Sequence, residues 1–134
     1  MIVETPREVS VPLRQVFDVA VAAARASRGG DELLTALLPP GDDPLVALVA
    51  AGSVRVAVSD GAVIGVAVVA HGVLGALYVA PEHRRHGAGR EFATTLFNAP
   101  DGPRDGWALP GDRATKSLYE SMGMKARLLT MRAE

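Results

Sequence analysis

The chain has 134 residues, a length that suits one domain with its own core, so we expect residues 1–134 to fold as a single unit. Its formal net charge of −1 gives no support for a general binder of nucleic acid, and the absence of cysteine excludes disulfides, thiolate metal sites and a cysteine nucleophile. We find no signal-like start and no apolar run of membrane-spanning length, and we expect a cytoplasmic protein that uses no metal and no membrane.

The first part of the chain is predicted to be helical after a short strand or irregular lead-in over residues 1–9. Ser10 is a good N-cap, and the apolar residues that follow it recur at helical spacing, which predicts an amphipathic helix that ends near Ser27. Two shorter helices are expected over residues 31–38 and 43–52, where proline and glycine supply start and stop signals.

Four acidic residues fall in this helical region, and two interpretations of them stay open. They could attract a cationic amine, or they could act as helix caps and solubilising charges, which their positions ahead of helical runs favour. They are Asp31, Glu32, Asp42 and Asp43.

The middle of the chain has the pattern of a three-strand antiparallel meander. Residues 54–58 and 62–70 are apolar runs joined by Ser-Asp-Gly, a typical hairpin turn. His71 with its following glycine forms a second tight turn into a third strand over residues 74–79, which is apolar on both faces, as in a sheet covered on both sides. His71 could act as a general base, although a lone histidine at a turn is more often simply exposed.

A basic, glycine-bearing loop follows this strand and precedes a helix. Pro81 ends the strand, and apolar residues at helical spacing predict a helix from near Gly87 to about Phe97. Glycines let a ligand approach the free N–H groups of a helix start, and arginines add charge, so we interpret the loop as a candidate phosphate or pyrophosphate site. The alternative is a solvated basic loop with capping glycines. The loop residues are Arg84, Arg85, His86, Gly87, Ala88, Gly89 and Arg90.

The C-terminal part is predicted to hold a brief strand over residues 107–109, a helix and a final strand over residues 125–132. Asp112 fits the N-cap of the helix, and Gly123 fits the left-handed conformation that closes it. The order of elements predicts an α/β (α+β) fold, in which helices flank a mixed, mostly antiparallel sheet.

Two segments resemble the GNAT superfamily of acyl-CoA-dependent N-acetyltransferases. One is similar to the acyl-CoA signature of that family, and the other, over residues 114–124, is similar to a later helix that carries a tyrosine, here Tyr119. The resemblance covers residues 53–134, whereas the first fifty residues match only in being helical. The residues that match the signature are Val79, Pro81, Arg84, Gly87 and Gly89.

The resemblance implies a single GNAT-like domain that moves an acetyl group from its cosubstrate, acetyl-CoA, to a primary amine of a small molecule or peptide by direct attack. In the family, the pantetheine arm lies along the strand before the loop, which here means Leu77, Tyr78 and Val79, and the pyrophosphate meets the loop from Arg84 to Arg90. A backbone N–H near Val79 is the implied donor to the oxyanion. The family is often dimeric, so a homodimer is a further expectation.

The resemblance also implies that Tyr119 protonates the leaving thiolate, since a phenol is a suitable acid for a thiol. The alternative for Tyr119 is a core tyrosine at helical spacing. Asp112 stands where the family often has asparagine, and its charge would repel phosphate groups. The strand over residues 74–79 lacks the acid that some members use as a base, so the amine would have to lose its proton to water, to a distant residue such as His71 or Glu82, or before it binds.

Two other classes of function remain open. The first is a non-catalytic acyl-CoA-binding or regulatory protein on the same fold, which would bind CoA without transferring its acetyl group. The second is a protein that binds another pyrophosphate, such as a nucleotide, although neither nucleotide fingerprint is present in the sequence.

Overall fold

The computed structural model describes residues 1–133 and, at Arg85, the backbone alone; its centre is one sheet of five strands in the order β1-β2-β3-β4-β5. Strands β1 to β4 pair antiparallel with their neighbours, and β5 runs parallel to β4. This is the mixed, mostly antiparallel sheet that the sequence predicts. The strands are β1 (Ile2–Glu4), β2 (Val54–Ser59), β3 (Ala62–Ala70), β4 (Val73–Val79) and β5 (Asp105–Gly106).

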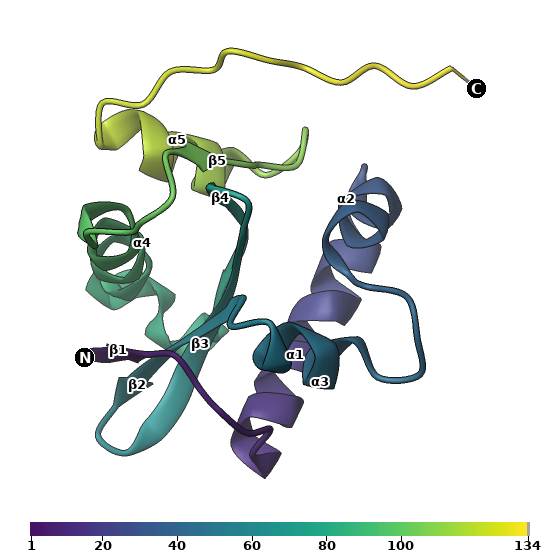
Figure 1. Ribbon diagram of the computed structural model, residues 1–134. Coiled ribbons are helices and arrows are strands. Elements are labelled where there is room, and N and C mark those ends of the chain that lie inside the picture. Colours follow the sequence, from purple (N-terminus) through teal and green to yellow (C-terminus); the bar gives the residue numbers. More distant parts are fainter. Residues whose placement is uncertain (134) are drawn as a thin grey trace.

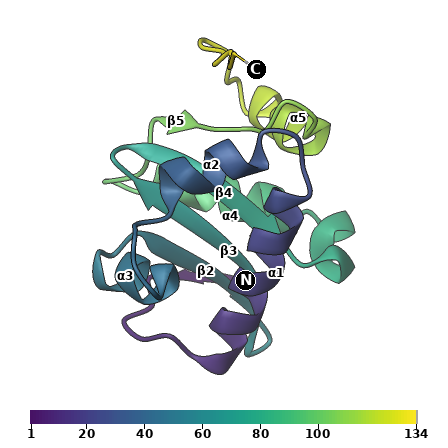
Figure 2. The same cartoon turned by 90° about the vertical axis from the view of Figure 1, so that its right-hand side faces the viewer.

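Helices cover both faces of the sheet (Figure 1 and Figure 2). On one face lie α1 (Val11–Arg25), α2 (Gly30–Leu37) and α3 (Pro44–Ala50). On the other face lie α4 (Ala88–Asn98) and α5 (Arg113–Ser121), and a short 3-10 helix, η1 (Pro81–His86), connects β4 to α4. No helix within residues 1–133 is both long and apolar enough to cross a membrane.

Each face of the sheet buries its own hydrophobic cluster, because successive side chains of a strand point to opposite faces. On the α1 side, Leu13 and Phe17 pack with Leu45 of α3 and with valines of β2 and β3. On the α4 side, Phe92 is fully buried and packs in a cluster with Leu74 of β4. β4 is therefore apolar on both faces because helices cover both sides of the sheet, as predicted.

Short polar side chains set the helix starts where the sequence places them. The hydroxyl of Ser10 accepts a hydrogen bond from the N–H of Leu13 (3.2 Å), and a carboxylate oxygen of Asp43 accepts one from Val46 (3.3 Å). Arg14 donates two further hydrogen bonds to the Asp43 carboxylate, at 3.1 and 2.6 Å, and these hold the pKa of Asp43 below its ordinary value. Asp43 is thus a helix cap, the role that its position favoured.

The hairpin between β2 and β3 turns where the sequence predicts. Asp60 and Gly61 both adopt positive φ angles, 51° and 78°, which are the left-handed conformations that a two-residue hairpin turn of this kind requires. His71 also has a positive φ, 55°, at the turn between β3 and β4.

The predicted strand over residues 107–109 is wrong, because the chain pairs two residues earlier, at Asp105 and Gly106. The ring of Tyr119 lies against β5 so closely that a Cβ on Gly106 would come within 2.8 Å of the Tyr119 Cε2 atom. Only glycine leaves room for the ring at this position, so the paired residues include a glycine, which a strand pattern in the sequence does not favour.

The predicted final strand over residues 125–132 is also wrong. Among the described residues, this segment pairs with no strand, and it runs along the outside of the molecule (Figure 1). The side chains of Leu128 and Met131 are 90% and 81% exposed. Alternating apolar residues favour a strand, but a strand also needs a partner backbone, and β5 offers only two residues.

Candidate functional site

One edge of β4 is open along most of its length. β5 pairs only with Val73 and Leu74, and the N–H of Trp107 then donates to the carbonyl oxygen of Leu74 (3.0 Å) before the chain leaves the sheet. From Gly75 to Val79, no strand within residues 1–133 pairs with this side of β4. Its backbone N–H and C=O groups can therefore bind an extended chain that carries amides, as an added strand.

The side chains of the three predicted arm-binding residues point away from this edge, onto the two faces of the sheet. Leu77 packs with the cluster on the α4 side, where Val79 is buried, whereas Tyr78 lies on the α1 side. Leu77, Tyr78 and Val79 can therefore meet a ligand at the edge only through backbone atoms, as the resemblance implies.

The open edge leads directly to the start of α4. The residues between them form η1 and not an irregular loop, and Gly87 follows with a φ of 75°, a left-handed conformation that favours glycine. Helix α4 then begins at Ala88, close to the predicted Gly87. None of the described side chains caps this helix start, so its first N–H groups are available to an anion.

Gly87 and Gly89 serve different purposes. Gly87 needs glycine for its backbone conformation, whereas Gly89 lies inside α4 with an ordinary φ. A Cβ on Gly89 would meet only Val79 Cγ2, at 4.0 Å, among the described atoms. The absence of a side chain at Gly89 thus keeps the surface between the helix start and the end of β4 uncovered.

Two arginines of the loop contact neighbouring elements. Arg84 Nε donates a hydrogen bond to the carbonyl oxygen of Val79 (2.8 Å), and its guanidinium carbon lies 5.2 Å from the centroid of the Tyr78 ring. Arg90 Nη1 donates to the hydroxyl of Ser121 on α5 (2.6 Å). The prediction for Arg85 concerns a side chain outside the described part of the structure, and His86 is exposed beside Gly87.

Tyr119 lies in the core on the α4 side. Its ring packs edge-on against Phe97, with a centroid distance of 5.7 Å. Its hydroxyl is buried and has no hydrogen-bond partner among the described atoms. Burial raises the pKa of the phenol well above 10, and the negative charge of Asp112 raises it further.

Asp112 caps α5, as predicted. One carboxylate oxygen accepts from the N–H of Thr115 (3.0 Å), and the other accepts from the Thr115 hydroxyl (2.6 Å). Both oxygens of Asp112 are engaged at the start of α5. Helix capping therefore explains why an aspartate can occupy this position, where the family often has asparagine.

The structure brings most of the candidate residues together at one end of β4. Leu77 to Val79, Arg84 and the start of α4 are contiguous, and the bond between Arg90 and Ser121 joins them to α5. His71 lies at the other end of β4, roughly 20 Å away for a strand of seven residues. A general base must lie within hydrogen-bond reach of its proton, so His71 could act as a base only for a reaction at its own end of β4. Across the described part of the chain, no group of three or more His, Asp or Glu side chains is arranged to hold a metal ion.

A small apolar cavity of about 50 Å³, which the sequence does not predict, lies between α1, α2 and the sheet. Ala20 and Ala24 line it from the apolar face of α1, and Tyr78 lines it from β4. The signal that could have revealed it is the pair of alanines, since small residues on a core-facing helix leave space.

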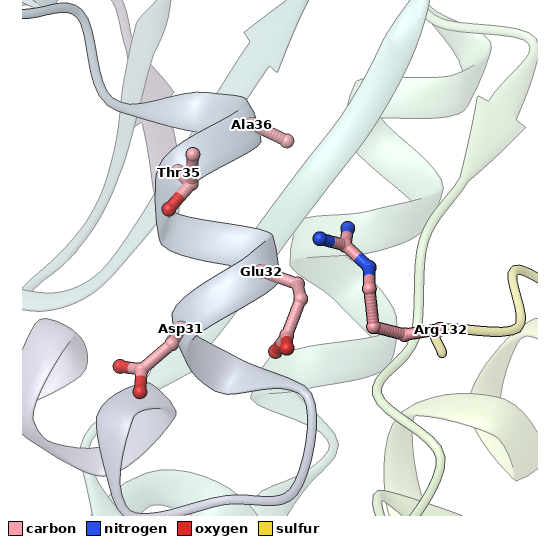
Figure 3. A pocket seen from close by; sticks show the side chains of 5 residues that line it. All are labelled: Asp31, Glu32, Thr35, Ala36 and Arg132. Carbon is pink, nitrogen blue, oxygen red and sulfur yellow. The ribbon is translucent and has the colours of Figure 1, made fainter. Parts of the chain in front are cut away.

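A larger cavity of about 310 Å³ lies between α2 and the C-terminal segment. Figure 3 shows the side chain of Arg132 reaching from the C-terminal segment toward α2, on the side where Glu32 projects from the helix. Asp31, Thr35 and Ala36 complete the lining, which includes no residue of β4 or of the basic loop. This cavity is therefore separate from the candidate site, despite its size.

Comparison with known proteins identifies the fold. No protein-family model and no curated protein sequence matches the chain. The aminoglycoside N-acetyltransferase AAC(6')-Iy, solved in complex with CoA, is 17% identical over 92% of this chain and 91% of that one, with a TM-score of 0.50. A protein from Xanthomonas campestris pv. campestris, assigned to the GNAT family of acetyltransferases, is 20% identical over 98% of this chain and 92% of that one, with a TM-score of 0.51. The chain therefore has the fold of the GNAT-family acetyltransferases.

Proposed function

We propose that the protein is an N-acetyltransferase that moves an acetyl group from acetyl-CoA to a primary amine. The observation that carries this proposal is the open edge of β4 from Gly75 to Val79, which leads to the uncapped start of α4. A pantetheine arm has amides that match an open strand edge, and a pyrophosphate matches a helix start. AAC(6')-Iy, which shares the fold, was solved with CoA, and this supports the same cosubstrate here.

The residues at this end of the sheet fit the two parts of CoA. Backbone groups along Leu77, Tyr78 and Val79 would hold the arm, apart from the carbonyl of Val79, which already accepts from Arg84. The first N–H groups of α4, from Ala88 onward, would hold the pyrophosphate together with Arg84 and Arg90. Because Nε of Arg84 is engaged with Val79, its two terminal NH₂ groups are the part that would face a phosphate. His86, Gly87 and Gly89 lie beside the path by which the pyrophosphate would reach the start of α4. A contact of Arg85 with the pyrophosphate stays a prediction from the sequence.

The reaction needs no covalent enzyme intermediate. The lone pair of a neutral amine attacks the thioester carbonyl carbon, and a C–N bond forms while the carbonyl oxygen becomes an oxyanion. A backbone N–H near Val79 would stabilise that charge. The C–S bond then breaks, the sulfur leaves with the electron pair, and the amide nitrogen loses its remaining excess proton to solvent or to the sulfur.

Tyr119 is the proposed donor to the departing sulfur. Its raised pKa keeps the phenol protonated at neutral pH. Its hydroxyl has no hydrogen-bond partner among the described atoms. The same raised pKa makes full transfer of the proton to a thiolate unfavourable, since a thiol has an ordinary pKa of about 8.5. We infer that Tyr119, once a shift of α5 or β5 exposes its hydroxyl, donates a hydrogen bond to the developing thiolate. The thiolate takes its final proton from water or from the amide nitrogen.

The burial of Tyr119 also favours a second candidate, a non-catalytic acyl-CoA-binding or regulatory protein. Its side chain is 6% exposed, and a hydroxyl enclosed in the core cannot reach a ligand unless α5 or β5 shifts. In that case Tyr119 is a packing residue, and the open edge of β4 binds CoA without transfer.

Two measurements separate these functions. Acetyl-CoA should raise the melting temperature, because a ligand that binds only the folded state stabilises it. Thiol release from acetyl-CoA, measured against a panel of primary amines, should then show transfer to at least one of them. Binding without transfer to any amine would favour the regulatory protein, and no thermal shift at millimolar acetyl-CoA would refute both. A homodimer and a cytoplasmic location stay predictions.

A further inference from the structure

We propose that the amine acceptor carries a short aliphatic group, and that this group occupies the apolar cavity between α1, α2 and the sheet. The inference rests on the proposed function and names the class of its second substrate. It begins from the composition of the cavity wall, which has only one polar side chain, that of Tyr78. The wall consists of Phe17, Ala20, Val21, Ala24, Leu33, Leu34, Leu37, Leu38, Val66, Val68, Ala76 and Tyr78.

The wall selects against a charged occupant. It includes no carboxylate and no histidine, so an ammonium group inside it would lose its hydration without gaining a counter-ion. An alkyl group loses only unfavourable contact with water when it enters such a space. The cavity therefore suits the carbon part of an amine and excludes a polycation.

The size of the cavity limits the alkyl group. One water molecule needs about 10–15 Å³ of such space, so a cavity of about 50 Å³ holds roughly three to five heavy atoms. That is the size of an isopropyl or isobutyl group and is far smaller than an amino sugar. Most of the lining residues, Ala24 and Leu33 among them, are half-buried, so the cavity lies close to the surface.

The position of the cavity joins it to the proposed transfer site. Tyr78 lines the cavity with its side chain, and its backbone belongs to the open edge of β4. An alkyl group seated beside Tyr78 therefore places its amine close to the strand along which the acetyl donor would lie. The same apolar surroundings disfavour the ammonium form by desolvation, which helps to supply a neutral nucleophile where β4 has no acidic residue.

The elements that form the cavity also point to the acceptor and not to the acyl donor. Eight of the twelve lining residues come from α1, from α2 and from Leu38 directly after α2. This part of the chain lies outside the segments that resemble the acyl-CoA signature. AAC(6')-Iy shares the fold and is an aminoglycoside acetyltransferase, and the apolar wall described here predicts a different class of acceptor for this chain.

The first test measures binding without turnover. Isobutylamine is titrated into the protein, alone and with CoA, while the methyl NMR signals of Val21, Leu33 and Leu37 are followed; ethanolamine serves as the polar control. We expect saturable shifts of these methyl groups with isobutylamine and none with ethanolamine. Equal responses to the two amines, or no saturable shift with isobutylamine, would overturn the assignment.

Matched variants of α1 test the location. Ala24→Leu places a larger side chain in the cavity, and Ala20→Leu does the same from one helical turn earlier in α1. If one of the two variants folds poorly, the other still tests the location. Ala23→Leu adds the same atoms at an exposed position. We expect the dissociation constant of isobutylamine to rise at least tenfold in either cavity variant and to stay unchanged in Ala23→Leu, with CoA affinity unchanged in all three. Parent-like binding of isobutylamine by both cavity variants would overturn the location.

Turnover distinguishes this inference from the proposed function. In a thiol-release assay, isobutylamine should be acetylated in preference to ethanolamine, spermidine and kanamycin. Transfer to the polycations but not to isobutylamine would overturn the inference and leave the proposed function intact. Saturable binding of isobutylamine without transfer to any amine would refute the proposed function, and with it the acceptor role, while the apolar site would stand. A preference for butyryl-CoA over acetyl-CoA that disappears in Ala24→Leu, with amine affinity unchanged, would assign the cavity to the acyl group and overturn the inference.

Discussion

Arg84 is bonded to the strand that precedes it: its Nε atom donates a hydrogen bond to the carbonyl oxygen of Val79 over 2.8 Å. The same guanidinium lies over the ring of Tyr78, 5.2 Å from its centroid. Both contacts fasten the first turn after β4 to the end of the strand. The side chain that the sequence assigns to phosphate binding therefore also positions the open edge that would hold the pantetheine arm.

Replacing Arg84 should separate these two roles. Arg84→Lys keeps the positive charge, but a lysine cannot bond the Val79 carbonyl and present a pair of donors to a phosphate at the same time. Arg84→Ala loses the charge and the donors. We expect acetyl-CoA to bind about tenfold more weakly to Arg84→Ala, with a shallower dependence on salt, and to bind with intermediate affinity to Arg84→Lys. Calorimetric titration at two salt concentrations measures both effects, with the exposed Arg28→Ala as a control. Equal affinity and equal salt dependence in all four proteins would argue against charge-assisted binding at Arg84.

The two glycines at the start of α4 should respond in opposite ways to alanine. Gly87→Ala forces a side chain into a φ of 75°, so we expect it to lower stability by about 1–2 kcal/mol. Gly89→Ala adds a methyl group in an ordinary helical conformation with room around it, so we expect stability to rise by up to about 1 kcal/mol. If phosphate approaches this helix start, Gly89→Ala should nevertheless weaken CoA binding. Thermal unfolding and CoA titration measure the two properties, and a stabilised Gly89→Ala that binds CoA like the parent would place the phosphate elsewhere.

Removing the hydroxyl of Tyr119 should make the protein more stable. Tyr119→Phe keeps the ring against Phe97 but deletes a buried donor that has no partner among the described atoms, so we expect a gain of about 1–3 kcal/mol. If the hydroxyl donates a hydrogen bond to the departing sulfur, the single-turnover rate should fall, by up to about 10²–10³. A gain in stability with an unchanged single-turnover rate would show that Tyr119 is a packing residue.

The raised pKa of Tyr119 predicts a loss of stability at alkaline pH. The unfolded chain ionises this phenol near pH 10, whereas the folded protein keeps it neutral to a higher pH. The folded state therefore binds the extra proton, and its stability falls as the pH rises above 10. Tyr119→Phe lacks this linkage, so the difference in melting temperature between the variant and the parent should widen above pH 10. A difference that stays constant from pH 8 to pH 11 would contradict the burial of the hydroxyl.

The sequence by itself determines those features whose cause lies within a few residues. Ser10, Asp43 and Asp112 each cap a helix by accepting from an N–H three positions ahead, so the cap and its partner are read from the same short segment. The hairpin at Asp60 and the helix start after Gly87 have the same local origin, because a positive φ favours few residue types. The succession from β4 to the start of α4 was predictable because strand, turn and helix follow one another directly.

Only the tertiary structure decides features that join distant segments. β5 lies at Asp105 and Gly106 and not in the apolar run after them, and the ring of Tyr119, from a distant helix, fills the space above Gly106. The apolar segment with Leu128 stays unpaired within the described chain, because its own pattern cannot supply a partner strand. The missing partner of the Tyr119 hydroxyl and the cavity beside Tyr78 likewise arise from packing between elements far apart in sequence, where burial and excluded volume, and not local propensity, set the outcome.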